Sequence, residues 1–336
     1  AIVARVRAPG APSGRASAAP APTHPVLTLY QWTPTGRRFR PNAHVVIEEH
    51  PMNGFRVEIR TNSLGHRHPE VGPKSRRRVL FLGDSITAQD FLPEDKTFVR
   101  LVEELAQDRG FEIEAINAGV GAISLQTELA ILVESGLQLE PDIVVLGFYL
   151  NDFADSSSVR YPKLPALLSW SWLARHIVVV ASRRETPLDA GAWRSELGRL
   201  YPSGAGDYRV DKGAFNRLIH RHVKEWGGAW SPHAWERMTP LFAEFERLAR
   251  SNDFKLMIVA FPVRQQVEAS YVYDYPQQRL HELSRSLDVP LLDLLPILGS
   301  QSEYPAEEVF YDQCHHTPEG SRLIAGAIVD FLASAL

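Results

Sequence analysis

The chain has 336 residues, 44% of them hydrophobic and 23% charged, and its formal net charge is −4. This length allows a sizeable core, as one elaborated α/β domain or as a domain with an insertion. The weakly acidic balance gives no electrostatic reason to bind nucleic acid or an anionic membrane, and no apolar run approaches the roughly 18 residues of a membrane span. Neither a nucleic-acid partner nor a membrane span within the chain is therefore expected.

The N-terminal part divides into two segments of different composition. Residues 1–24 are rich in Ala, Pro, Arg, Gly and Ser, which cannot form a core and predicts a disordered tail or linker. This segment resembles the spacer that follows an export signal or membrane anchor, which favours an extracytoplasmic or secreted location. Residues 25–72 contain short alternating segments, such as 55–60, and predict a small β-rich lead-in.

The pattern over residues 73–336 is that of an α/β domain. Apolar runs predict buried strands, and helical spacing predicts amphipathic helices between them. The first strands are expected at 79–82, 113–116 and 142–148, and the first helices at 97–109 and 124–137. This order predicts a mainly parallel central sheet with helices on both faces, which is a three-layer α/β/α fold.

The alternation stops between about 153 and 234, where polarity is mixed and most of the tryptophans lie. We interpret this stretch as an insertion into the α/β domain. Trp170, Trp172 and Trp230 either line a substrate pocket or form the insertion's own small core. The alternation then resumes with a helix expected at 236–251, a strand at 255–261, a helix at 277–287, a strand at 289–292 and a helix at 318–335.

A serine follows the first predicted strand directly, in the segment Gly-Asp-Ser-Ile that ends at Ile86. Ligands collect beyond the carboxyl ends of parallel strands, which is where a nucleophile belongs. At a helix N-terminus, free N–H groups would also favour negative charge developing near Ser85. Position alone is equally consistent with a strand-to-helix turn in which Asp84 or Ser85 caps the helix.

An acid and a histidine, Asp312 and His315, lie three residues apart just before the last predicted helix. A serine hydroxyl needs a base to take its proton, and a histidine oriented by a carboxylate suits that task. In a turn, this spacing lets Asp312 reach one ring nitrogen of His315 while the other nitrogen points away. Taken alone, such a pair is more often a surface ion pair than a catalytic one.

Two further segments follow the second and third predicted strands. Asn151 can present its side-chain N–H groups to an oxyanion, or it can cap a turn. The small residues of 117–122 either let backbone N–H groups approach a substrate closely or only make a tight turn. Because the carboxyl ends of parallel strands share one edge of a sheet, all four segments are expected to face one crevice.

Taken in order, these segments resemble the conserved blocks of the SGNH, or GDSL-type, hydrolase family. The segment around Ser85 is similar to the first block, Asn151 falls at the Asn of the third, and Asp312 with His315 resembles the last. The resemblance implies a flavodoxin-like α/β/α fold and a catalytic triad of Ser85, Asp312 and His315. It covers roughly residues 55–152 and 236–336.

The resemblance also implies an oxyanion hole, formed by the N–H of Ser85, an N–H from the second block and the side chain of Asn151. The family's second block usually ends in Gly, but an ungapped alignment places Ala122 there, with Gly121 before it. A positive φ is costly for alanine. Either Ala122 donates its N–H from an ordinary conformation or Gly121 takes the role. Asp84, beside the nucleophile, is a further candidate for substrate contact.

The sequence thus predicts a serine esterase that cleaves a small-molecule or carbohydrate ester through an acyl-enzyme intermediate. One alternative is an O-acyltransferase that uses the same triad on a carbohydrate or other alcohol acceptor. Another is an inactive carbohydrate- or lipid-binding module. No cofactor and no metal is expected. The single cysteine, Cys314, precludes an intramolecular disulfide and is interpreted as a partly buried residue without chemistry.

Overall fold

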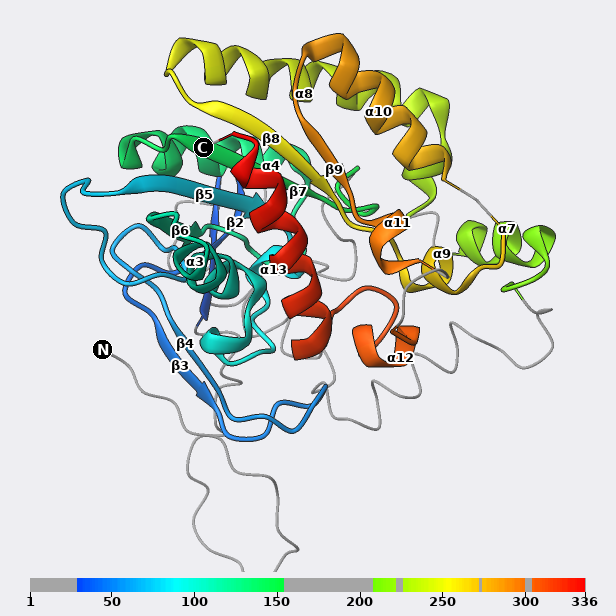
Figure 1. The fold of residues 1–336 in the computed structure, drawn as a ribbon, viewed down its shortest axis with the longest axis horizontal. Helices are drawn as coiled ribbons and strands as arrows, with labels where there is room; N and C mark the ends of the chain where they lie inside the picture. Colours follow the sequence, from blue (N-terminus) through cyan, green and yellow to red (C-terminus); the bar gives the residue numbers. More distant parts are fainter. Residues whose placement is uncertain (1–28, 154–207, 222–225, 272–273, 300–303, 336) are drawn as a thin grey trace, which may run out of the picture.

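The computed structural model describes residues 29–153, 208–221, 226–271, 274–299 and 304–335. At its centre lies a five-stranded sheet in the order β6-β5-β7-β8-β9, in which every neighbouring pair is parallel (Figure 1). The strands are β5 (Arg77–Gly83), β6 (Ile113–Asn117), β7 (Ile143–Phe148), β8 (Lys255–Ala260) and β9 (Leu291–Asp293). In chain order this is the 2-1-3-4-5 arrangement of flavodoxin-like folds.

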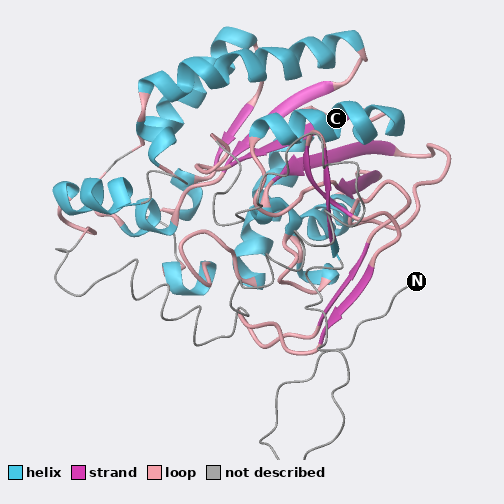
Figure 2. Cartoon of the chain, turned by 180° about the vertical axis from the view of Figure 1, so that it is seen from behind, coloured by secondary structure: helices cyan, strands magenta, loops and turns pink. Residues whose placement is uncertain are grey.

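Helices cover both faces of the sheet, as Figures 1 and 2 show. Helices α3 (Phe98–Asp108) and α13 (Pro318–Ala333) pack against each other on one face. The other face carries α4 (Leu125–Ile131), α8 (Pro232–Ser251) and α10 (Tyr275–Leu287). From β5 the chain moves to β6 at one edge of the sheet, and afterwards it adds β7, β8 and β9 in the opposite direction. Because crossovers between parallel strands are right-handed, the connecting helices before and after this reversal lie on opposite faces. The predicted three-layer α/β/α fold is confirmed.

Short helical segments connect these elements. They are α2 (Ser85–Ala88), η1 (Glu94–Lys96), the π-helical turn η2 (Leu132–Gly136), η3 (Leu137–Leu139), α7 (Lys212–Arg221), η5 (Gly227–Trp230), α9 (Arg264–Glu268), α11 (Leu295–Leu298) and α12 (Ala306–Val309). The helix expected at 124–137 is therefore divided into α4, the wider π-helical turn η2 and the tighter 3₁₀ turn η3.

Most predicted boundaries differ from the structure by one or two residues, and two of the differences have a clear physical reason. The final strand begins at Leu291 rather than 289, because Asp288 adopts a left-handed conformation (φ 55°) after α10 and the N–H of Val289 still bonds to Ser284. Helix α8 begins at Pro232 rather than 236. Proline suits the first position of a helix, where its missing N–H would have no partner within the helix.

Two antiparallel hairpins precede the sheet. Strands β1 (Tyr30–Thr33) and β2 (Gly36–Phe39) form the first, and β3 (His44–Ile47) and β4 (Val57–Arg60) form the second. The segment after β4 contacts α2 through Arg67, whose buried guanidinium donates hydrogen bonds to three carbonyls at the end of α2 and in the turn after it. The acceptors are Ala88 at 3.0 Å, Gln89 at 2.6 Å and Leu92 at 2.7 Å.

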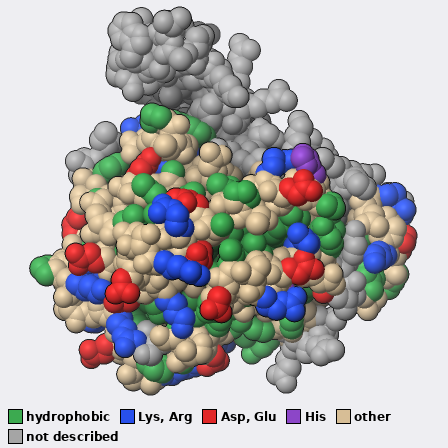
Figure 3. Space-filling model, turned by 90° about the horizontal axis from the view of Figure 1, so that it is seen from above, with side chains coloured by type: hydrophobic (Ala, Val, Ile, Leu, Met, Phe, Trp, Pro, Cys, Tyr) green, Lys and Arg blue, Asp and Glu red, His purple; other side chains and the backbone are tan. Residues whose placement is uncertain are grey.

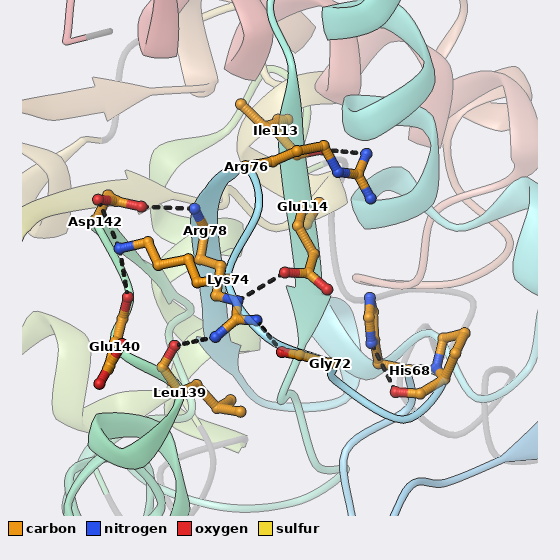
Figure 4. A network of polar contacts seen from close by, with 12 residues as sticks. His68, Gly72, Lys74, Arg76, Arg78, Ile113, Glu114, Leu139, Glu140 and Asp142 are labelled. Carbon is orange, nitrogen blue, oxygen red and sulfur yellow. Dashed lines mark hydrogen bonds and ion pairs between the residues drawn. The ribbon is translucent and has the colours of Figure 1, made fainter.

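The amino-terminal edge of the sheet is held by a polar network around the buried Arg78 (Figure 4). Its guanidinium donates to the Glu114 carboxylate at 2.7 Å and to the Leu139 and Gly72 carbonyls at 2.8 and 2.5 Å. Its backbone N–H donates to Asp142 at 2.7 Å. These bonds join β5, β6 and the entry to β7 at the edge opposite the carboxyl ends of the strands.

The surface view in Figure 3 shows basic and acidic side chains interspersed over one face of the molecule. That distribution agrees with the small net charge of −4. Within the described ranges, no helix is both long and apolar enough to cross a membrane.

The loop after β6 passes very close to α2 at Gly119. A Cβ on Gly119 would lie 2.5 Å from the backbone nitrogen of Ala88 and 2.8 Å from the carbonyl carbon of Thr87. Because backbone atoms cannot rotate away, we expect Gly119→Ala to lower the free energy of unfolding by about 1–3 kcal/mol in urea denaturation. Gly326→Ala on α13 is the control, because its Cβ would meet nothing within 4 Å. Equal effects of the two substitutions would contradict the prediction.

Candidate active site

Ser85 stands at the first position of α2, directly beyond the carboxyl end of β5. The tight strand-to-helix turn depends on Gly83, since a Cβ there would lie 2.1 Å from Thr87 Oγ1. Asp84 caps the helix, and its Oδ1 accepts a hydrogen bond from the N–H of Ile86 at 2.9 Å. The turn therefore presents the Ser85 hydroxyl at the edge of the sheet where ligands bind in folds of this kind.

Three side chains form a continuous hydrogen-bonded row. His315, in the loop between α12 and α13, places Nε2 3.0 Å from Ser85 Oγ. Its Nδ1 lies 2.6 Å from Asp312 Oδ2. The other carboxylate oxygen, Oδ1, accepts the backbone N–H groups of Cys314 at 2.8 Å and His315 at 2.7 Å. The structure thus brings Ser85, His315 and Asp312 together although 230 positions separate the serine from the histidine.

Asp312 and His315 each stabilise the charged form of the other. Burial acts to raise the pKa of Asp312, but the positive charge of His315 and three hydrogen bonds hold that pKa below its usual value. Burial acts to lower the pKa of His315, but the Asp312 carboxylate holds it well above its usual value. The pair therefore favours an ionised Asp312 beside a protonated His315, which is the charge state that a carboxylate can stabilise.

An aromatic side chain that the motifs do not include packs against the histidine. The Phe91 ring lies edge-on to His315, with 5.0 Å between centroids and 72° between planes. Phe91 is buried and also contacts Tyr311 edge-on at 6.4 Å. It lies in the loop after α2, where nothing in the local sequence pattern indicates a contact with a residue of the C-terminal loop.

The thiol of Cys314 lies against His315. Its Sγ is 3.6 Å from His315 Nδ1, and burial raises the pKa of the thiol to about 12. In the described part of the chain, Asp312, Cys314 and His315 are the one set of side chains close enough together to hold a metal ion, with their ligand atoms within 4.8 Å. At neutral pH the thiol stays protonated, however, and a protonated thiol is a poor metal ligand.

The segment after β6 comes close to Ser85 at Gly121. A Cβ on Gly121 would lie in ordinary contact with Ser85 Cβ, at 3.8 Å, but only 2.9 Å from the Tyr30 hydroxyl, which would have to move. Ala122 has a φ of +60°. Of the two alternatives for this block, donation of the Ala122 N–H from an ordinary conformation is therefore excluded. A left-handed conformation costs a non-glycine residue about 1–2 kcal/mol, which the surrounding contacts must offset.

A hydrogen bond joins Asn151 to Asp84, the residue before Ser85. The Asn151 amide hydrogen-bonds to the Asp84 carboxylate, which is completely buried. Burial raises the pKa of Asp84 despite its hydrogen bonds from Ile86 and Asn151. This burial places Asp84 under the turn, away from the surface where a substrate would approach.

A second buried acid, Asp152, follows Asn151. Its Oδ2 accepts the N–H of Tyr149 at 2.8 Å. Burial, followed by the nearby carboxylates of Glu128 and Asp84, raises the pKa of Asp152 well above its usual value. Asp84 and Asp152 therefore carry protons at pH values where an exposed aspartate is ionised.

Of the tryptophans expected near the substrate, only Trp230 falls within the described residues, since Trp170 and Trp172 lie outside them. Trp230 is partly buried at the end of η5, and its ring lies 6.0 Å from that of Phe215 on α7. It packs on the same hydrophobic cluster as the buried Trp226 and Trp235. This environment agrees better with a core role than with a pocket wall.

Comparison with protein-family models and with curated proteins finds no match. Among solved structures, the chain is similar to an acetyl xylan esterase, AlAXEase, with 14% identity over 76% of this chain and 99% of that one and a TM-score of 0.45. It is similar to a variant of Axe2, an acetyl-xylooligosaccharide esterase from Geobacillus Stearmophilus, with 14% identity, coverages of 78% and 95% and a TM-score of 0.45. A GDSL-like lipase from Bacteroides thetaiotaomicron gives 14% identity, coverages of 80% and 93% and a TM-score of 0.40. At these values the functional assignment rests on the geometry of the site itself.

Proposed function

We propose that the protein is a serine-dependent ester hydrolase of the SGNH type. The observation that carries this proposal is the row of contacts from Ser85 Oγ to His315 Nε2 at 3.0 Å and from His315 Nδ1 to Asp312 at 2.6 Å. A surface ion pair or a helix cap would not need a serine hydroxyl at the far side of the imidazole. A nucleophile activated by an oriented base needs this arrangement.

The reaction proceeds in two acyl transfers. His315 removes the Ser85 proton as Oγ attacks the ester carbonyl carbon, and the tetrahedral intermediate then collapses. His315 returns that proton to the departing alcohol, which leaves an acyl group on Ser85. In the second half, His315 takes a proton from water as its oxygen attacks the acyl-enzyme, and it returns the proton to Ser85 Oγ when the carboxylic acid leaves. Asp312 holds the ring and its charge throughout.

The oxyanion hole of this proposal comprises the Ser85 N–H, a backbone N–H from Gly121 or Ala122 and the Asn151 amide. An amide carries two N–H groups. When one of them bonds to Asp84, the orientation of the Asn151 side chain is set and the other N–H is available for the substrate oxygen. Asp84 therefore acts by orienting Asn151 and the turn, and we do not propose it as a substrate contact. Each well-aimed donor contributes about 10²–10³ in kcat.

A panel of esters from acetyl to long-chain acyl groups tests the proposed function, because turnover requires the whole row of contacts. Wild-type protein is expected to release free carboxylic acid from part of the panel and to react covalently at Ser85 with a fluorophosphonate. If it shows neither turnover nor labelling, the proposal is refuted and an inactive binding module is favoured.

The same assay separates hydrolysis from transfer. Repeating it with an added sugar or other alcohol acceptor is expected to leave free acid as the main product. Acylated acceptor as the main product would instead identify an O-acyltransferase with the same triad.

A further inference from the structure

The first hairpin, β1–β2, connects two loops of the active site. Arg37 on β2 donates a hydrogen bond from Nη1 to the carbonyl oxygen of Gly121 at 3.0 Å, within a buried environment. The same guanidinium lies over the Tyr30 ring, 3.4 Å from its centroid. Tyr30 in turn donates its hydroxyl to Asp90 Oδ2 at 2.5 Å. Since Asp90 follows the helix of the nucleophile, the hairpin links that helix to the loop at Gly121.

The acceptor of the Arg37 bond belongs to a peptide group that also carries an oxyanion donor. The carbonyl of Gly121 and the N–H of Ala122 are parts of one planar, trans peptide unit, so they point in opposite directions. A donor that fixes the Gly121 oxygen therefore fixes the direction of the Ala122 N–H. A charged donor on the oxygen also polarises the unit, which makes its N–H a stronger donor.

This peptide unit needs such a restraint because Ala122 is left-handed, with φ +60°. Turning the peptide plane changes ψ of Gly121 and φ of Ala122 together. The turn would return Ala122 to a favourable negative φ, but it would also aim its N–H away from the oxyanion. The hydrogen bond from Arg37 to Gly121 opposes that rotation.

We propose that Arg37 is a positioning residue for the oxyanion hole, which holds the Gly121–Ala122 peptide with its N–H toward the substrate oxygen. This inference rests on the proposed function, and it extends the site to a hairpin that lies outside the segments resembling known blocks. Arg37 does not touch the substrate. Its effect should therefore appear in the transition state rather than in substrate binding.

Arg37→Met tests the proposal, with Arg38→Met as the matched control. Arg38 is the next residue of the same strand and is equally buried, but its ion pair is with Glu134 at 2.9 Å, on the π-helical turn after α4. We expect Arg37→Met to lower kcat and kcat/KM together by about ten- to hundredfold, which is less than the roughly 10²–10³ that complete removal of one donor costs, because the variant misaims the N–H without removing it. KM and the pH midpoint of activity should change little. Arg38→Met should keep kcat within about threefold of wild type.

A double-mutant cycle with Ala122→Gly distinguishes positioning from general destabilisation. Glycine adopts a positive φ without penalty, so the peptide no longer gains from turning. The fold-loss caused by Arg37→Met is therefore expected to be several-fold smaller in the Ala122→Gly background than in wild type. Arg37→Lys, which keeps the charge and one donor, is expected to retain more activity than Arg37→Met and covers the case in which the methionine variant fails to fold.

The possible outcomes separate this inference from the function on which it rests. An active wild type in which Arg37→Met and Arg38→Met behave alike, or in which the loss is the same in both Ala122 backgrounds, overturns the role of Arg37 and leaves the esterase intact. A wild type that neither turns over esters nor reacts with a fluorophosphonate overturns both.

Discussion

Replacing Ser85 with alanine is expected to lower kcat for ester hydrolysis by about 10⁴- to 10⁶-fold, because the nucleophile and its bond to His315 are lost together. The hydroxyl is partly buried and α2 keeps its cap from Asp84, so the fold should persist. The measurements are steady-state hydrolysis, intact-mass detection of a fluorophosphonate adduct and thermal unfolding of each variant.

Ser286→Ala is the matched control for that experiment. Its hydroxyl lies on α10 and donates to the Leu283 carbonyl at 2.8 Å. We expect this variant to retain full turnover and labelling. Undiminished labelling of Ser85→Ala would remove Ser85 from the mechanism.

The second large effect is expected from Asp312→Asn, which should lower kcat by about 10⁴-fold. When the amide of the variant side chain donates a hydrogen bond to Nδ1 of His315, the ring proton lies on Nε2. The Nε2 atom then faces Ser85 as a donor and cannot accept the hydroxyl proton. The carboxylate that stabilises the imidazolium is also absent. Asp253→Asn is the control, since Asp253 sits in an exposed left-handed turn (φ 56°) that asparagine accepts equally well.

The pH profile gives an independent readout of the same pair. Only the neutral imidazole is a base, so activity rises as the pH rises through the pKa of His315. Burial lowers that pKa, but Asp312 raises it well above its ordinary 6.5. The acid limb of kcat/KM in wild type should therefore have its midpoint above pH 6.5 and should move to lower pH in Asp312→Asn. A limb that stays in place would show that the carboxylate does not set the charge of the base.

The position of Ser85 in the fold could be predicted because it follows from topology. Parallel strands end at one edge, so a serine after β5 and an asparagine after β7 had to be neighbours once the alternating pattern was recognised. The local geometry of Asp312 and His315 is likewise a short-range property. One carboxylate oxygen takes two backbone N–H groups in the turn, and that leaves the other oxygen for the imidazole.

The contacts that hold the site in place could not be predicted in this way. Arg37 and Arg38 are identical neighbours in the sequence, yet one reaches Gly121 and the other reaches Glu134. Nothing in a hydrophobic period or motif separates them, because both partners are distant in the chain. The left-handed Ala122 is a similar case, since tertiary contacts impose a conformation that the residue type disfavours.

The buried acids under the site couple folding to proton uptake. Burial raises the pKa values of Asp84 and Asp152 above their usual 3.8, so between that value and their native pKa values the native chain holds protons that the denatured chain releases. Groups of this kind make the free energy of unfolding greatest below about pH 4 and reduce it as the pH climbs toward their native pKa values. The contribution of these two residues to stability is thus complete in acid and is lost as the pH rises through their native pKa values.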